Sequence, residues 1–228
     1  MEAQEKARFL SRVNFLEPLS SKEIASLAQK IPDVSLRRGQ IFYTPGYNAR
    51  VVFLLLEGRM RVYRAVGAQQ LTLDVVEAGT MFGEPAFTAW SQGAYAEALE
   101  PSRVALVSLD LLRSLVYDRP EVSLKIVELL SDRLHLYGSR MADIALKEVT
   151  ARLAGLILHL VESQESVSGE GRKVPTRYTY EQLGTMVGAQ RVAVTRALGE
   201  LRKAGAVQTS QRHIYVRDIE ALERIAGR

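Results

Sequence analysis

Residues 179–204 read TYEQLGTMVGAQRVAVTRALGELRKA, and this stretch predicts two helices joined by a tight turn. Thr179 and Gln182 have the spacing of a capping box, in which a threonine hydroxyl accepts a hydrogen bond from the backbone N–H three residues later. The first helix should stop at Gly188, because glycine readily adopts the left-handed conformation that ends helices. The second helix should begin near Arg191 and continue to the end of the stretch.

A β-hairpin should follow the second helix. Gly205 ends that helix, and residues 206–209 and 213–216 have the composition of two short strands. Residues 210–212 join the strands in a turn. A helix, a tight turn, a second helix and a β-wing are the elements of a winged helix-turn-helix.

The second helix has one apolar and one polar face. By helical spacing Val194, Ala197, Leu198 and Leu201 point inward. The polar face begins with an amide and a guanidinium, which can pair with base edges in the major groove, and Val192 can contact a thymine methyl group. An αα-hairpin without any ligand is the alternative. The residues that we expect to contact bases or phosphates lie on this face, at the start of the first helix or at the tip of the wing: Thr179, Tyr180, Gln190, Arg191, Val192, Thr195, Arg196 and Arg212.

Charge and composition narrow the possible classes of function. The chain has 228 residues and a net charge of +4. Residues 151–228 hold 12 Lys and Arg against 8 Asp and Glu, whereas the two kinds balance in residues 1–150, so the basic excess suits an anionic partner of the last third. The absence of cysteine excludes disulfides, thiolate metal sites and iron–sulfur clusters. No catalytic constellation and no metal site is visible, so we expect a protein that is not an enzyme.

No segment of the sequence is typical of a membrane or secreted protein. The first thirty residues alternate charges with short apolar runs, unlike a signal peptide. No stretch approaches 18 uninterrupted apolar residues. We therefore expect a soluble cytoplasmic protein with no membrane partner.

Between Val34 and Leu109 the sequence predicts strands. Short β-rich runs recur there, and glycines separate them, which is typical of an all-β barrel or sandwich. The expected strands are 40–43, 51–56, 60–63, 71–76, 81–82 and 104–108. Before this region, residues 7–31 predict one or two short helices, with Ser20 or Ser21 as a cap and Glu23 in the first turn.

A long helix should run from Pro120 to about Leu146. Six apolar residues within it, called the seam below, follow a heptad spacing that is typical of helices that pair with a second helix. They are Val127, Leu130, Leu134, Tyr137, Met141 and Ile144. An ordinary helix packed on its own domain is the alternative. The additional apolar residues at positions 122, 126, 129 and 136 favour a dimer, because this flank can cover the β domain while the seam meets a partner.

The fold class that we expect is therefore α+β, in three parts. Residues 1–118 form a β-roll of the jelly-roll type, residues 119–147 the dimerisation helix, and residues 148–228 the winged helix-turn-helix. Within the last part, a helix should span residues 149–163 and a polar loop residues 166–173.

The chain as a whole resembles the CRP/FNR family of bacterial transcription regulators. The resemblance rests on four segments: 38–46 and 53–63 in the roll, 79–84 in its sensing loop (GTMFGE), and 187–196 (VGAQRVAVTR) in the DNA-reading motif. It implies a homodimer with a cyclic-nucleotide-binding-like domain, a long dimerisation helix and a DNA-binding domain on a hinge near residues 147–150. It also implies double-stranded DNA and RNA polymerase as partners, and a small-molecule anion as an effector.

The resemblance places an effector pocket in the roll but disfavours cAMP. In members that bind cAMP, an arginine followed by a serine or threonine clamps the phosphate, and an ungapped alignment from Gly83 puts Ala94 and Tyr95 at those positions. Losing a charge-assisted pair costs roughly 1.5–3 kcal/mol. Members that sense 2-oxoglutarate remain possible relatives, because Arg133 matches one of their effector-binding positions. A pocket filled by aromatic side chains, in a protein controlled by its abundance, is the other possibility. The expected pocket residues are Phe82, Gly83, Glu84, Ala94, Tyr95, Arg133 and Tyr137.

Two functions from different classes follow. The first is a homodimeric regulator that reads an inverted-repeat operator with its second helix. The alternative is a cyclic-nucleotide-type regulatory subunit that binds a small molecule and a protein partner but no DNA. The first function predicts operator binding that weakens with salt and requires Arg191, whereas the alternative predicts neither.

Overall fold

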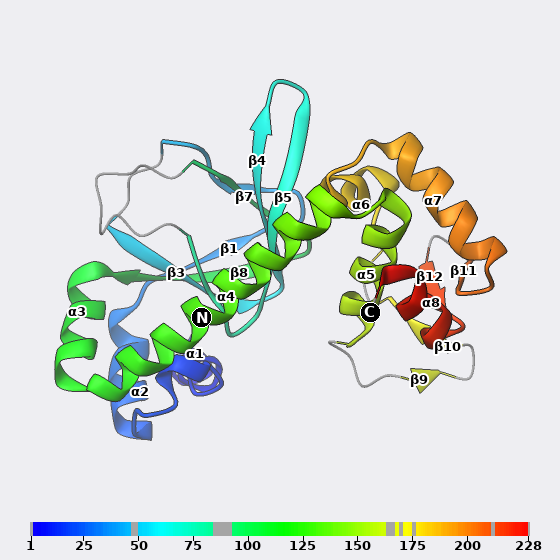
Figure 1. Ribbon diagram of the computed structural model, residues 1–228. Coiled ribbons are helices and arrows are strands. Elements are labelled where there is room, and N and C mark those ends of the chain that lie inside the picture. The colour runs from blue at the N-terminus through cyan, green and yellow to red at the C-terminus, as the bar shows by residue number, and fades with distance from the viewer. Residues whose placement is uncertain are drawn as a thin grey trace. The chain divides into compact units, whose positions relative to one another are not determined.

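The computed structural model divides the chain into two compact units (Figure 1). It describes residues 2–46, 50–83, 93–162, 167–168, 171–174, 177–210 and 213–227. The first unit comprises Met1–Gln69 and Leu73–Leu136, and the second comprises Gln70–Thr72 and Tyr137–Arg228. In the described residues no helix is long and apolar enough to cross a membrane.

Two four-stranded antiparallel sheets form the roll of the first unit. One sheet has the order β1-β8-β3-β6 and the other the order β2-β7-β4-β5. The strand bounds are β1 Asp33–Leu36, β2 Ile41–Tyr43, β3 Val51–Glu57, β4 Arg59–Val66, β5 Gln69–Glu77, β6 Met81–Phe82, β7 Tyr95–Ala98 and β8 Ser102–Ser108. The sequence therefore predicted the β-rich region correctly.

Strand β3 forms the centre of this core. All its residues from Val52 to Leu56 are buried, as the apolar run predicts for a strand covered on both faces. Gly58 then turns the chain into β4 with a φ of +83°, and a Cβ there would lie 2.3 Å from Ser102 Oγ. No other residue type fits this turn without a shift of its neighbours.

Two strands of the roll were not predicted from the sequence. Strand β1 pairs with β8, and β7 pairs with both β2 and β4. Strand β7 reads YAEA and has no β-branched residue, so its local sequence carries little strand signal. Its place in the sheet comes from pairing with segments that lie more than 30 residues away in the chain.

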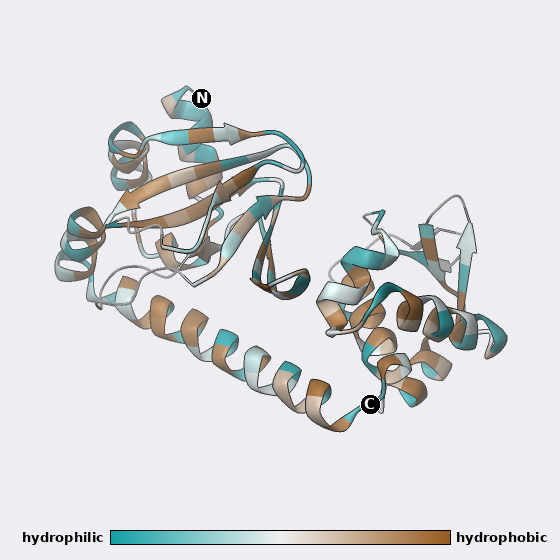
Figure 2. Ribbon diagram, turned by 90° about the horizontal axis from the view of Figure 1, so that it is seen from above, coloured by the Kyte–Doolittle hydropathy of each residue, from teal (hydrophilic) through white to brown (hydrophobic). Residues whose placement is uncertain are grey.

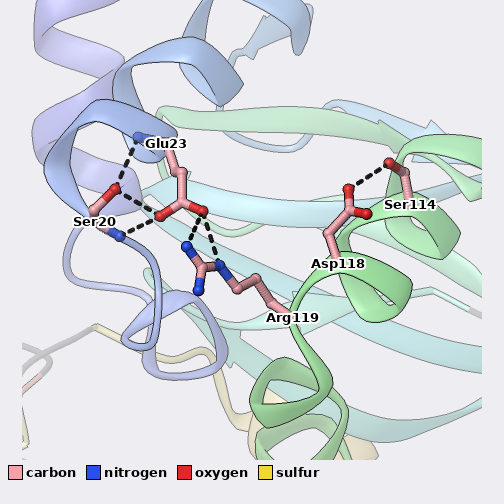
Figure 3. A network of polar contacts seen from close by, with 5 residues as sticks. All are labelled: Ser20, Glu23, Ser114, Asp118 and Arg119. Carbon is pink, nitrogen blue, oxygen red and sulfur yellow. Dashed lines mark hydrogen bonds and ion pairs between the residues drawn. The ribbon is translucent and has the colours of Figure 1, made fainter.

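Short helices cover one side of the roll. They are α1 Ala3–Leu10, a 3₁₀ turn at Asn14–Leu16, α2 Ser21–Lys30 and α3 Leu109–Asp118, of which α3 was not predicted. Ser20, one of the two serines expected as the cap, caps α2, and Glu23 completes a capping box that was not predicted. Arg119, just after α3, donates from Nε and Nη2 to Glu23 Oε1 at 2.8 and 2.6 Å (Figure 3). This contact joins the α2 N-terminus to the segment where the long helix begins.

The long helix α4 spans Pro120–Leu146, the predicted bounds. Val122 is fully buried in the core of the first unit, and Ile126 and Leu129 pack against the same core. Apolar residues also recur along the rest of the helix (Figure 2). Those of the seam are exposed in the single chain. The flank and the seam therefore lie on different faces, as the sequence predicted.

The second unit contains a helix-turn-helix and a β-wing. Its elements are α5 Val149–Glu162, β9 Val167–Ser168, β10 Gly171–Lys173, α6 Tyr180–Val187, α7 Arg191–Lys203, β11 Val207–Ser210, β12 His213–Val216 and α8 Ile219–Ala226. The sheet order is β11-β12-β10-β9. Helix α5 packs against α6, α7 and α8.

Two features of this unit differ from the prediction. The polar loop at residues 166–173 contains two short strands instead, because β10 pairs with β12 of the wing. Helix α8 was missed, although Asp218 is a clear N-cap whose side chain accepts from Ala221 N at 2.9 Å. The apolar side of α8 packs on α5 and completes the core of the unit.

Candidate nucleic-acid interface and effector region

Helix α6 begins and ends with the groups that the sequence indicated. Thr179 Oγ1 accepts from Gln182 N at 3.1 Å, and Gln182 Oε1 accepts from Thr179 N at 2.9 Å. The hydroxyl proton of Thr179 is not used by this box and remains able to donate to a phosphate. Gly188 ends the helix with a φ of +64°.

The turn between α6 and α7 is tighter than the sequence predicted. Ala189 N donates to Gly184 O at 2.8 Å, and a Cβ on Gly184 would lie 2.5 Å from Ala189 O. Gly184 is therefore a close-approach position inside a helix, and it fixes the angle between α6 and α7. Sequence reasoning singled out Gly188 and passed over Gly184, because a glycine inside a helix gives no signal of its own.

Helix α7 buries the four residues that its periodicity predicts. Val194, Ala197, Leu198 and Leu201 are each at most 1 % exposed. This apolar face holds α7 against α5 and α6. Because this face is buried in the core of the unit, the opposite face of α7 points away from the core.

The outer face of α7 presents exposed polar and apolar groups. Arg191 is exposed in its first turn, and in the described part of the chain its guanidinium has no ion-pair partner. Val192 is 78 % exposed, which is high for a valine in a folded unit. Arg196 is exposed as well, with Nε 3.8 Å from Glu200 Oε1. Three candidate residues thus project from one side of the helix.

The remaining candidates are placed as follows. Gln190 is the exposed N-cap of α7, and its side chain makes no capping hydrogen bond, so its amide is available. Thr195 Oγ1 donates back to Arg191 O at 3.0 Å, which uses its proton within the helix. Tyr180 is half-buried at the start of α6. Arg212, expected at the wing tip, lies outside the described residues.

An arginine next to the α6 cap was not anticipated. Arg177 is exposed and donates from Nε to His213 Nε2 at 2.7 Å, across to β12 of the wing. Burial lowers the pKa of His213, and the charges of Lys173 and Arg177 lower it further. The ring is therefore held neutral, with Nε2 as an acceptor that orients Arg177. Local sequence gives no signal for this pair, because 36 residues separate its members.

The six seam residues of α4 are all exposed in the single chain. Their exposed fractions run from 38 % at Tyr137 to 74 % at Leu134. A solvent-facing row of large apolar side chains along one helix is typical of a surface that another protein covers. The geometry thus matches a helix-pairing surface.

The effector residues of the roll that the structure describes do not form one cluster. Phe82 is 1 % exposed and packs with Phe42, Tyr43 and Phe53, whose ring lies 5.6 Å from that of Phe82. It is a core residue of the roll. Gly83 follows with a φ of +91°, and Glu84 lies outside the described residues.

Tyr95 lies on the other face of its sheet, so the expectation that it fills a pocket beside Phe82 is wrong. Tyr95 pairs with Tyr63 and stacks on its ring at 5.0 Å, whereas Ala96, the next residue of β7, belongs to the Phe82 core. Side chains alternate between the faces of a strand. Ala94 is buried. Because β7 itself was not predicted, the sequence could not assign these faces.

Arg133 reaches the roll from α4. Its guanidinium donates to the carbonyl of Met81 in β6, and its Nε lies 3.9 Å from Asp74 Oδ2 in β5. Both charged side chains are largely buried. Tyr137, one helical turn later, belongs to the second unit. Sequence reasoning identified Arg133 but not its carboxylate partner.

Comparison with known families and structures agrees with this arrangement. Residues 33–118 match the family model of the cyclic nucleotide-binding domain, and residues 151–225 match that of the Crp-like helix-turn-helix domain. The two matches correspond to the roll and to the unit that contains α6 and α7.

Relatives match over nearly the whole chain. A CRP-like cAMP-activated global transcriptional regulator of Mycobacterium tuberculosis is 26 % identical over 95 % of this chain and 98 % of the relative. The transcriptional regulator SdrP of Thermus thermophilus is 28 % identical over 85 % of this chain and 93 % of its own. Among solved structures, a CooA mutant from Carboxydothermus hydrogenoformans has a TM-score of 0.80 at 25 % identity and covers 97 % of this chain and 99 % of CooA. The chain belongs to the CRP/FNR family of transcription regulators.

Proposed function

We propose that two copies of this chain bind one duplex and read an inverted repeat with their α7 helices. The observation that carries the proposal is the outer face of α7, where Arg191 is exposed in the first turn and has no ion-pair partner among the residues that the structure describes. The other face of the helix is buried in the core of the unit. An arginine at this place can pair with O6 and N7 of guanine in the major groove. Arg196 and the α6 cap would contact bases or phosphates beside it.

The seam supports the second part of the proposal. An exposed row of six apolar residues costs free energy in water, and a second copy of the same helix covers it by symmetry. A two-fold dimer places its recognition helices about 34 Å apart, one turn of DNA. RNA polymerase is the further partner that the family resemblance implies.

Sequence discrimination by Arg191 tests the DNA-binding part. A duplex selected from a random library by the purified protein serves as operator, and a scrambled duplex serves as reference. Arg191→Ala should weaken operator binding about 5- to 150-fold, equivalent to roughly 1–3 kcal/mol, and bind the scrambled duplex almost unchanged. Arg224→Ala, an exposed arginine of α8 outside the proposed interface, is the matched control. Equal losses on both duplexes would contradict base reading, and no salt-sensitive DNA binding at all would favour a regulatory subunit that acts on a protein partner.

The oligomeric state tests the seam. Leu134→Glu places a charge in the middle of the row and should yield a monomer in sedimentation equilibrium. His135→Glu changes the neighbouring exposed residue outside the seam and should remain a dimer. If both variants have the same mass as the unchanged protein, the seam is not the interface.

A further inference from the structure

Arg133 is a half-buried cation whose charge is already matched by a carboxylate of the same chain. Its side chain is 19 % exposed and that of Asp74 13 %, and in the described part of the protein no other carboxylate lies within ion-pair distance of this guanidinium. The carbonyl oxygen of Met81 accepts a hydrogen bond from Nη2 of Arg133. Strands β5 and β6 thus hold the same arginine, which comes from α4.

The position of Asp74 follows from the pleat of β5. Thr72, Asp74 and Val76 are the buried residues of this strand, and Val76 belongs to the core of the roll. A carboxylate in such a row is unexpected unless a cation meets it, since burying an unpaired charge is costly. Arg133 is that cation.

The pair also determines which molecules can approach Arg133. Arg133 Nε lies 3.9 Å from Asp74 Oδ2, and a hydrogen bond adds about 3 Å, so an anion that accepts from this N–H would lie at most about 7 Å from the Asp74 carboxylate. At an effective dielectric constant near 20, repulsion at that distance weakens binding on the order of 100-fold. The internal carboxylate also acts at a high effective concentration, because it is part of the same fold.

We propose that Asp74 is the internal counter-ion of Arg133 and prevents small anions from binding to the roll. The protein then binds DNA without an anionic effector. The inference rests on the proposed function, because it concerns how that DNA binding is controlled. It gives Arg133 of α4 a role within the chain although Ala94 stands where cAMP-binding members have the phosphate-clamping arginine.

Calorimetric titration of the full-length protein with 2-oxoglutarate, and separately with cAMP, tests this directly. The unchanged protein should bind neither anion at millimolar concentration. Asp74→Asn keeps the shape and removes the charge, so it should bind at least one of them on the order of 100-fold more tightly. Arg133→Gln in the Asp74→Asn background should abolish the gain, because the cation is then gone. Binding by the unchanged protein as tight as by Asp74→Asn, or no gain in Asp74→Asn, would overturn the proposal.

A second measurement needs no variant and covers the case in which Asp74→Asn does not fold. In protein labelled with ¹⁵N-arginine, the Nε resonance of Arg133 should not move when 2-oxoglutarate is added. A concentration of about 10 mM is used, because it would fill even a weak site with a Kd of about 1 mM. A saturable shift would overturn the proposal. Operator binding is measured on the same preparations. If the unchanged protein binds the anion and also binds its operator, only this inference is overturned. If it shows no specific DNA binding, the proposed function is overturned.

Discussion

Replacing Gly184 by alanine perturbs the turn on which the recognition helix depends. The added Cβ would lie 2.5 Å from the carbonyl oxygen of Ala189, whereas ordinary contacts begin at 3.4 Å. The obstacle is backbone, so no side chain can rotate away. The α6–α7 turn must open instead, and its hydrogen bond from Ala189 N to Gly184 O must lengthen.

The expected change in the free energy of unfolding is the difference between two opposing effects of the added methyl group. Overpacking a closely packed site costs about 1–3 kcal/mol. Replacing a glycine inside a helix by alanine gains about 0.5–1 kcal/mol. Gly199 in α7 supplies the matched control, because a Cβ there meets nothing within 4 Å and only the gain applies.

Urea unfolding, combined with hydrogen exchange of the α6 and α7 amides, measures both variants. Gly184→Ala should be less stable than Gly199→Ala by about 1–3 kcal/mol, with faster exchange confined to the second unit. Gly199→Ala should equal or exceed the unchanged protein in stability. If Gly184→Ala is as stable as Gly199→Ala, the close approach does not constrain the turn.

Two further predictions concern pH. Hydrogen bonds from the Ser20 hydroxyl and backbone, followed by those from Arg119, lower the pKa of Glu23 to about 2 (Figure 3). Because the folded pKa lies below the unfolded value near 4.5, the stabilisation is present above pH 4.5 and is lost as pH falls toward 2. Glu23→Gln should therefore flatten the dependence of stability on pH in that window, and an unchanged slope in chemical unfolding would contradict the assignment. For His213, burial and then the charges of Lys173 and Arg177 lower the pKa, so the unfolded chain takes up the proton first and stability should fall as pH drops below 6.5. His213→Gln, whose amide oxygen can still accept from Arg177, should remove this fall, and a persistent fall measured by unfolding between pH 5 and 7 would assign it to another group.

The elements with strong local signals were predictable from the sequence. The capping box at Thr179, the left-handed Gly188 and the seam of α4 all lie where the residues indicate, and the cap of α2 is one of the two serines expected. In each case the energetic cause is confined to a few neighbouring residues or to a single helical period.

What escaped prediction depends on contacts between distant segments. Strand β7 exists because β2 and β4 flank it, and only its register shows that Tyr95 faces away from Phe82. The partner of Arg133 lies 59 residues earlier, on a strand whose burial pattern decides that Asp74 points toward it. Helix α8 is a different case, since its Asp218 cap was readable and was overlooked.

Two joined copies should present their α7 helices at a fixed separation of one DNA turn. Binding of the full-length protein to its selected inverted repeat, compared with the same duplex carrying five extra base pairs between the half-sites, measures that separation directly. The insertion rotates one half-site by about half a turn, so only one α7 can engage. The affinity should therefore fall at least about 100-fold, to that of a single half-site. Equal affinity for both duplexes would show that the two α7 helices are not held at a fixed separation.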